Sequence, residues 1–250
     1  MNPIVVIPAR MAARRLPGKP LADIGGEPMI VRVWRQAAAA GIGPVAVAAG
    51  DREIVEAVTA AGGLAVLTDP DLPSGSDRVL AALAMIDPEG RHDAVINLQG
   101  DMPFVAPGVV AACAGLLAAQ PGCDIATVVA AESGPADRAN PDVVKAVLAL
   151  PPGARSGRAL YFTRSTLHGD GPVWRHVGVY GYRRAALRRF NAAPASPLER
   201  RENLEQLRAL ELGLSIWAAV VDAAPISVDT PADLAAARAE AARLSESSNP

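Results

Sequence analysis

The chain has 250 residues, of which half are hydrophobic and a fifth are charged. This composition excludes a disordered or collagen-like chain and is typical of a globular protein with a sizeable core. The 24 basic and 26 acidic residues nearly cancel. We therefore expect neither nucleic acid nor a membrane as a partner, because no global positive field attracts them. Any bound anion must be held by a local cluster of cations.

The cysteines and the longest apolar runs indicate the cellular compartment of the protein. Cys113 and Cys123 form no CxxC pair, so the spacing indicates neither a disulfide framework nor a zinc site and favours a reducing cytoplasm. The apolar run at the N-terminus covers only residues 4–7, which indicates a first strand and not a signal peptide. The uncharged stretch 102–123 is broken by prolines and glycines, so we interpret it as a loop and a buried helix.

Short runs rich in valine and isoleucine alternate with segments of helical periodicity. This rhythm is typical of a parallel sheet with helices on both faces. The predicted strands cover residues 4–7, 45–49, 64–67, 94–98, 125–131 and 216–221. The predicted helices cover residues 28–40, a segment after the N-cap Asp51, 76–86, about 197–211 and a C-terminal segment opened by Thr230 and Pro231. The predicted fold class is α/β, a Rossmann-like, mostly parallel sheet flanked by helices.

One region interrupts this rhythm. Residues 132–172 are rich in proline, glycine, arginine and aspartate, with short extended pieces at 143–148 and 159–163. We predict that they form a small inserted subdomain, a sugar-side lid or a dimer arm. The core is then formed by residues 1–131 and 173–245, and residues 246–250 form a flexible tail.

A loop rich in cations follows the first strand. The segment IPARMAARRLPGKPL places Arg10, Arg14, Arg15 and Lys19 within ten positions between prolines and a glycine. Ligands of α/β proteins bind at the carboxyl ends of strands. Fixed cations and backbone N–H groups there replace the lost hydration of a polyphosphate. The spacing matches neither GxGxxG nor a Walker A sequence, and a solvated basic loop is the alternative.

Two carboxylates complete the candidate site. Asp101 follows the strand 94–98 in the sequence NLQGDMP, and Asp229 precedes a helix in SVDTP. Mg²⁺ prefers such hard oxygen ligands with positions left open for phosphate. Each aspartate alone also fits an ordinary role as an N-cap or turn residue. Together with the cationic loop they predict a metal-triphosphate site and nucleotidyl transfer.

At this point the chain resembles the 3-deoxy-manno-octulosonate cytidylyltransferases, the CMP-Kdo synthetase family. The resemblance runs nearly end to end through IPARMAARRLPGKPL, SGSDR, NLQGDMP, ALYFTRS, RHVGVYGYR, ENLEQLR and VDTPADL. It implies the nucleotide-diphospho-sugar transferase fold and transfer of CMP from CTP to the anomeric hydroxyl of 3-deoxy-D-manno-octulosonate (Kdo). The products are CMP-Kdo, for lipopolysaccharide synthesis, and pyrophosphate. A cytoplasmic, Mg²⁺-dependent homodimer is implied as well.

The resemblance also implies roles for individual residues. Those implied for the nucleotide are Pro8, Ala9, Arg10, Arg15, Lys19, Ser74, Gly75, Arg78 and Gln99. Those implied for the sugar are Gln99, Arg164, His176, Tyr180, Glu205 and Gln206. Asp101 and Asp229 are the implied metal ligands, and Arg10, Lys19 and Asp101 are the implied catalytic residues.

Ordinary interpretations compete with several of these roles. Arg164 and His176 also fit the surface of a strand. For Glu202 and Arg208 we prefer the polar face of an amphipathic helix to a role in the site.

The sequence departs from the usual family pattern in places. Ala13 and Arg14 replace a Ser-Thr pair, Gly50 replaces a threonine and Met102 replaces a glutamate. The stretch between Arg164 and His176 is also shorter than in the family, so the sugar-side loop closes differently. The identity of the sugar therefore stays open between Kdo, an aminated Kdo such as 8-amino-Kdo and a sialic acid. A non-catalytic nucleotide-binding module of the same fold is the alternative of another class.

Overall fold

The computed structural model describes residues 1–13, 15–131, 135–169 and 171–247. Arg14 of the cationic loop, the start of the predicted insertion and the last three residues of the predicted tail lie outside this range. The described strands are β1 (Pro3–Ala9), β2 (Val45–Ala49), β3 (Leu64–Leu67), β4 (Ala94–Leu98), β5 (Ile125–Ala131), β6 (Lys145–Ala149), β7 (Ser156–Thr163), β8 (Trp174–Arg183) and β9 (Ile216–Val221). All six predicted strands are found, five of them with the predicted bounds and the first longer.

The helices alternate with these strands, which confirms the α/β class. They are η1 (Lys19–Leu21), α1 (Met29–Ala39), α2 (Arg52–Ala60), α3 (Gly75–Ile86), α4 (Pro107–Ala119), α5 (Pro135–Ala139), α6 (Arg184–Ala192), α7 (Pro197–Glu202), α8 (Gln206–Glu211) and α9 (Pro231–Ser247). None of the helices described is long and apolar enough to cross a membrane.

The chain divides into two compact units, each of which is described by itself. Unit 1 contains residues 1–3, 92–96 and 108–224, and unit 2 contains residues 4–91, 97–107 and the chain from Pro225 onward. The predicted insertion falls within unit 1, and the helix α9 extends two residues into the predicted tail. The predicted division into a core and an insertion stays a prediction.

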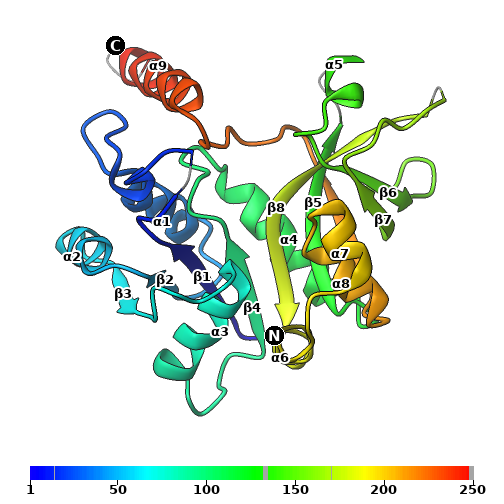
Figure 1. Ribbon diagram of the computed structural model, residues 1–250, viewed down its shortest axis with the longest axis horizontal. Helices are drawn as coiled ribbons and strands as arrows, with labels where there is room; N and C mark the ends of the chain where they lie inside the picture. Colours follow the sequence, from blue (N-terminus) through cyan, green and yellow to red (C-terminus); the bar gives the residue numbers. More distant parts are fainter. Residues whose placement is uncertain (14, 132–134, 170, 248–250) are drawn as a thin grey trace. The chain divides into compact units, whose positions relative to one another are not determined.

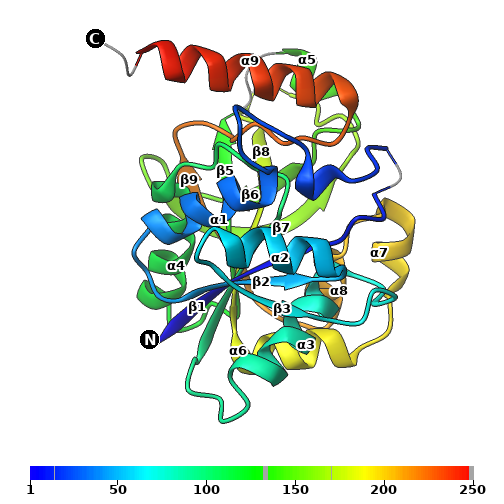
Figure 2. The same cartoon turned by 90° about the vertical axis from the view of Figure 1, so that its left-hand side faces the viewer.

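In unit 2, three parallel strands lie in the order β3-β2-β1 (Figure 1). The strand β1 is buried along almost its whole length, which its run of apolar residues explains. The helix α1 buries Met29, Ile30 and Val33 on one stripe, as its periodicity predicts. The helix α2 runs along β2 and β3 (Figure 2). The carboxyl ends of these strands lead into the loops that carry the candidate site.

The helix α9 packs within unit 2 on a cluster of buried side chains. Val228, Leu234 and Ala237 contact the same cluster as Ile24 and Met29. Thr230 begins the helix as predicted, because its Oγ1 accepts a hydrogen bond from the Asp233 backbone N–H and Asp233 Oδ2 accepts one from the Thr230 backbone N–H. The C-terminal segment is therefore attached to the start of the chain.

In unit 1, five strands pair in a closed ring, in the order β5, β9, β7, β6 and β8. The strand β5 pairs parallel with β9 and antiparallel with β8. The strand β7 pairs antiparallel with both β9 and β6, and β6 also pairs with β8. The two strands within the predicted insertion thus belong to the same sheet as β5 and β9. The helix α4 packs on this sheet, where Cys113 Sγ lies 3.6 Å from the Ala126 carbonyl oxygen.

The single long helix predicted over residues 197–211 is wrong. The segment forms two short helices, α7 and α8, because Asn203 adopts a left-handed conformation with φ of 53° and ends the first of them. Asparagine tolerates this conformation better than most residues. The helix α7 starts with a full capping box between Ser196 and Glu199.

Candidate active site

The cationic loop of unit 2 is a folded structure rather than a loose segment. The Met11 carbonyl oxygen accepts hydrogen bonds from the backbone N–H groups of Ala13 and Gly18, at 2.8 and 3.1 Å. Gly18 has a φ of 72°, a conformation that favours glycine. The Met11 N–H donates to Asp51 Oδ2 at 2.7 Å. Asp51 precedes α2 as predicted, but its side chain holds the loop and makes no capping bond to the helix.

The loop brings Lys19 between the two predicted metal ligands. Lys19 Nζ lies 3.1 Å from Asp101 Oδ2 and 3.1 Å from Asp229 Oδ1. Arg15 Nη2 lies 3.1 Å from Asp229 Oδ2, on the more exposed side of the cluster. Two carboxylates distant in the sequence thus converge on one cation. Their role as metal ligands stays a prediction.

Backbone bonds explain why these two aspartates meet. The Val228 N–H donates to the Asp101 carbonyl oxygen at 2.8 Å, which joins the two loops next to both carboxylates. Asp233 Oδ2 accepts a hydrogen bond from the Asp229 N–H at 3.1 Å. The cap of α9 therefore also fixes the backbone of Asp229. Asp233 was not predicted as a site residue, although its place three residues after Thr230 is a capping signal.

Burial and charge set the protonation of Asp101. Burial raises the pKa of the Asp101 carboxyl above its usual value, and Asp229 adds to the rise, while the ammonium of Lys19 opposes it. The carboxylate form is thus stabilised mainly by a neighbouring cation. Replacing that cation with another is electrostatically easier than leaving the carboxylate without one.

A cavity of about 650 Å³ opens beside this cluster. It is lined by Pro8, Ala9, Arg10, Ala12, Ala13, Lys19, Pro20, Leu72, Ser74, Gly75, Arg78, Gln99, Gly100 and Asp101. The structure therefore brings together all of the predicted nucleotide residues except Arg15, which pairs with Asp229 instead. The volume suits a small-molecule ligand.

Arg78 is held in the wall of this cavity. It is only 2% exposed, and its guanidinium donates to Thr68 Oγ1 and to the carbonyl oxygens of Asp69 and Pro70. Burial lowers the pKa of Arg78, and Arg10 lowers it further. A β-carbon at Gly50 would lie 2.8 Å from Arg78 Nη1. The departure from threonine at position 50 thus leaves room for this guanidinium.

Two other predicted residues combine local roles with a place in the cavity. Ser74 caps α3 by accepting a hydrogen bond from the Asp77 N–H at 3.1 Å. Gln99 Nε2 donates to Asn97 Oδ1 at 3.2 Å, which fixes the orientation of its amide. Met102 is 3% exposed, so the residue that replaces a glutamate here is a core residue.

In unit 1, His176 and Tyr180 of β8 lie together. Their ring centroids are 5.3 Å apart, and the Phe162 ring lies edge-on to His176 with centroids 5.1 Å apart. Burial lowers the pKa of His176 to about 4. Burial raises the pKa of Tyr180, and the charge of Glu205 raises it further. His176 and Tyr180 are thus in ring contact, and Glu205 lies near enough to Tyr180 to act on it electrostatically. Gln206 follows Glu205 in the chain.

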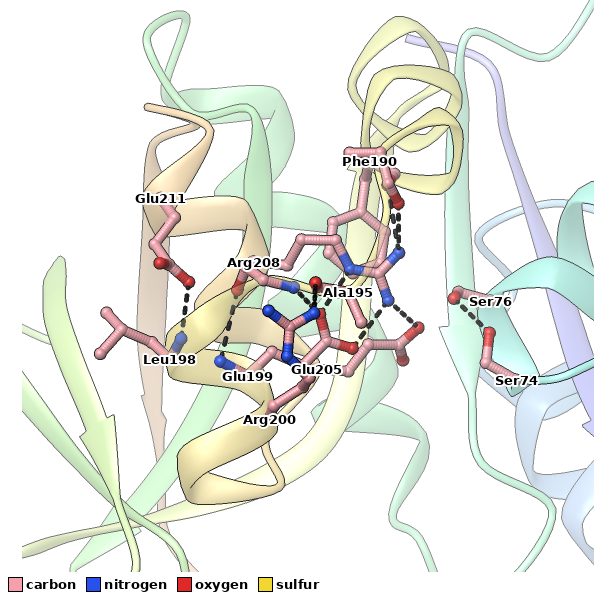
Figure 3. A network of polar contacts seen from close by, with 12 residues as sticks. Ser74, Ser76, Phe190, Ala195, Leu198, Glu199, Arg200, Glu205, Arg208 and Glu211 are labelled. Atoms are coloured by element: carbon pink, nitrogen blue, oxygen red, sulfur yellow. Dashed lines mark hydrogen bonds and ion pairs between the residues drawn. The ribbon is translucent and has the colours of Figure 1, made fainter.

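Arg208 holds α6, α7 and α8 together (Figure 3). It pairs with Glu199 through Nε at 2.8 Å and Nη2 at 2.9 Å, and donates to Glu205 Oε1 at 3.3 Å. Its guanidinium carbon lies 4.3 Å from the centroid of the Phe190 ring. The residue is 8% exposed and paired in the interior, so its assignment to the polar face of one amphipathic helix was wrong. The sequence did not reveal this buried pair because Arg208 follows the pattern of polar positions between the apolar residues of an amphipathic helix.

Arg164 is held by neighbours that sequence reasoning missed. The ammonium of Lys145, which is fully buried, donates to the carbonyl oxygens of Asn140, Val143 and Arg164, at 2.8, 2.9 and 2.7 Å. Arg164 Nη1 donates to the Pro141 carbonyl oxygen at 3.0 Å. Glu202, also assigned to the polar face of that helix, accepts hydrogen bonds from Thr163 Oγ1 and from the Arg164 N–H.

Comparisons with known proteins show the family of the chain. The family model "Cytidylyltransferase" matches residues 4–216. The 3-deoxy-manno-octulosonate cytidylyltransferase of Parvibaculum lavamentivorans is 58% identical over 98% of this chain and 94% of its own length. The protein of the same name from Rhodospirillum centenum is 59% identical over 95% of this chain and 93% of its own length.

A solved structure is similar as well. A CMP:2-keto-3-deoxy-manno-octonic acid synthetase in complex with CTP is 38% identical, with a TM-score of 0.89, over 98% of this chain and all of that one. This likeness confirms the predicted nucleotide-diphospho-sugar transferase fold. The chain belongs to the 3-deoxy-manno-octulosonate cytidylyltransferase family.

Proposed function

We propose that this chain transfers CMP from CTP to the anomeric hydroxyl of Kdo and releases CMP-Kdo and pyrophosphate. The observation that carries the proposal is the placement of Lys19 between Asp101 and Asp229 beside a cavity lined by the cationic loop. The names of the relatives favour CTP and Kdo as the substrates. The product serves lipopolysaccharide synthesis.

The triphosphate of CTP binds in the cavity of unit 2. Arg10 and Lys19 supply positive charge, and Arg15 supports them from the edge of the cluster. The loop is fixed by bonds to Met11 before any ligand arrives, so little ordering is needed on binding. Ser74, Gly75 and Arg78 line the cytidine side, and the bonds of Arg78 to the turn at Asp69 keep that wall rigid.

The two carboxylates fit a magnesium ion. Their oxygen atoms lie 3.1 Å from the same Nζ, so both already point to one position that holds a cation. The described residues contain no group of three or more His, Cys, Asp or Glu side chains placed to hold a metal. Phosphate oxygens and water would complete the shell. When bound, Mg²⁺ supplies neutralising charge at the phosphate oxygens.

The residues of the chain contribute mainly position and electrostatics. The sugar hydroxyl attacks the α-phosphorus in line with the leaving pyrophosphate. Lys19 leaves its carboxylate partners for the phosphate oxygens and stabilises the charge that develops there. The residues that we propose for binding the acidic sugar are Gln99 in unit 2 and, in unit 1, Arg164, His176, Tyr180, Glu205 and Gln206.

The direct test is pyrophosphate release by the purified protein. CTP and UTP are each combined with Kdo, 8-amino-Kdo and a sialic acid, with and without Mg²⁺. We expect turnover with CTP, Kdo and Mg²⁺. Turnover only with another sugar would replace the substrate, and no turnover with any pair would favour a non-catalytic module.

Variants test the site itself. Asp101→Asn and Asp229→Asn each remove one carboxylate, and we expect each to lower kcat/KM by about 10³-fold or more. Lys19→Ala should cost about 10²- to 10³-fold, on the scale of one preorganised charge contact. Asp222→Asn is the matched control, because its side chain is 91% exposed. Near-normal rates in either aspartate variant would refute the metal assignment.

The assembly and location follow from the same proposal. We expect a homodimer in the cytoplasm, where CTP is available. Light scattering at micromolar concentration tests the dimer, and a monomeric mass for the active enzyme would contradict it.

A further inference from the structure

Thr127 of β5 is a buried residue with a direct contact to His176. Its side chain is fully enclosed, and its Oγ1 lies 2.9 Å from His176 Nε2. The same oxygen lies 2.8 Å from the Val179 carbonyl oxygen and 3.4 Å from the Val177 carbonyl oxygen. One hydroxyl therefore has three polar neighbours within 3.5 Å.

An irregularity in the sheet creates this contact. The strands β5 and β8 lie side by side (Figure 1). Their register shifts between Thr127 and Val128. Thr127 pairs with Tyr180, whereas Val129 pairs with His176, so that both rings of β8 lie next to Thr127 on one face. Bulges of this kind often re-aim side chains beside functional sites.

The number of protons determines the direction of each bond. A hydroxyl has a single proton to donate, and a carbonyl oxygen can only accept. Because two carbonyl oxygens face Thr127 Oγ1, the closer of them at 2.8 Å, the hydroxyl proton belongs to Val179. The bond to His176 must then run from the imidazole N–H to the Thr127 oxygen.

We propose that Thr127 is a positioning residue that fixes His176 as the neutral tautomer with its proton on Nε2. Nδ1 then carries no proton and can only accept a hydrogen bond. No acidic side chain in the described part of the chain forms an ion pair with the ring, and its aromatic neighbours are Phe162 and Tyr180. Its lowered pKa agrees with a neutral ring at pH 7.

This inference deepens the proposed function and rests on it where it concerns the substrate. A neutral imidazole that can only accept through Nδ1 selects a hydroxyl donor and disfavours a carboxylate, which is itself an acceptor. His176 would thus contact a hydroxyl of the sugar acid. The carboxylate of the sugar acid would be bound by other groups, and Arg164 is the candidate cation in unit 1 for that contact.

Nitrogen NMR of the ligand-free wild-type protein tests the tautomer. The chain has three histidines, so His92→Gln and His168→Gln variants assign the His176 signals. At pH 7 we expect a protonated Nε2 and an unprotonated Nδ1. A protonated Nδ1, or a charged ring, would overturn the proposal. The measurement needs no substrate, so it stands apart from the proposed activity.

Substitutions at Thr127 test the positioning role. Thr127→Val keeps the shape but removes the acceptor, and we expect KM for Kdo to rise about tenfold, the scale of one hydrogen bond. The KM for CTP should not change. Thr127→Ser keeps the hydroxyl and should preserve both the tautomer and the wild-type KM for Kdo. Thr59→Val, at an exposed position of α2, is the matched control.

The outcomes separate the two proposals. Absence of turnover by the wild type with CTP and Kdo would refute the proposed function, whatever the tautomer. An unchanged KM for Kdo and an unchanged spectrum in folded Thr127→Val would refute the role of Thr127. If Thr127→Val does not fold, the wild-type and Thr127→Ser spectra decide, since both keep the hydroxyl.

Discussion

The charged groups of the two units are used in different ways. In unit 2, Lys19, Asp101 and Asp229 satisfy one another at the wall of an open cavity, with side chains that are 16 to 39% exposed. In unit 1, Arg208 and Lys145 are enclosed and donate mostly to backbone carbonyl oxygens and to Glu199. The first kind of charge can exchange its partner for a ligand, whereas the second kind fixes the backbone. We therefore expect substitutions of Lys19, Asp101 and Asp229 to affect activity most, and substitutions of Arg208 and Lys145 to affect stability most.

The largest loss of stability is expected for Arg208→Met. It leaves Glu199, whose side chain is only 15% exposed, without its partner. Breaking a buried pair in this way typically costs about 3–5 kcal/mol in the free energy of unfolding. Urea denaturation measures this change, and Arg208→Lys should lose less because it keeps the charge. A loss below about 1 kcal/mol would show that Arg208 contributes no more than an exposed ion pair to stability.

Lys145→Met should come next. The methionine fills the space but leaves three carbonyl oxygens without the ammonium, and hydrogen bonds to a charged group contribute about 1.5–3 kcal/mol each at most. We expect a decrease of about 3 kcal/mol in the free energy of unfolding, measured in the same way. Full stability in this variant would mean that water replaces the lost donor.

Asp101→Asn is expected to act in the opposite direction. Because burial raises the pKa of Asp101 in the folded protein, the ionised carboxylate costs stability above that pKa. The variant should therefore unfold at a higher temperature than the wild type near neutral pH. Its advantage should shrink as the pH falls from the folded pKa toward the ordinary aspartate value. A wild type that is more stable at neutral pH would reverse this sign.

The smallest effect on stability is expected for Arg15→Ala. Its side chain is 62% exposed, and such surface pairs contribute about 0–1 kcal/mol. The free energy of unfolding should stay within that range, while the KM for CTP rises modestly and more so at low salt. A large loss of stability would show instead that Arg15 stabilises the fold, as Arg208 and Lys145 do.

The sequence predicted unit 2 better than unit 1 for a physical reason. Arg10 and Lys19 belong to the loop that follows β1, and Asp101 belongs to the loop that follows β4, where parallel sheets gather functional side chains. The long-range bond from Val228 to Asp101, which brings Asp229 to the site, leaves no local signal. The strand bounds were recovered because their apolar runs are continuous and end at polar turns.

In unit 1 the residues that sequence patterns did not predict are those that hold other residues in place. Thr127 lies in an apolar run and looks like any strand residue, and its role comes from a register shift that no local pattern encodes. The break at Asn203 was overlooked because apolar periodicity continues across it. Lys145 did carry a signal, since a single charge inside an apolar run indicates a buried, paired group.

The attachment of α9 has a consequence for how the protein is made. Asp229 is held by Asp233 and by the bond between Val228 and Asp101, so the charge cluster needs residues from the last part of the described chain. A nascent polypeptide on the ribosome contains the cationic loop and Asp101 long before this segment emerges. It cannot assemble the complete constellation until synthesis has passed residue 233, so premature termination upstream would yield a protein without a working centre.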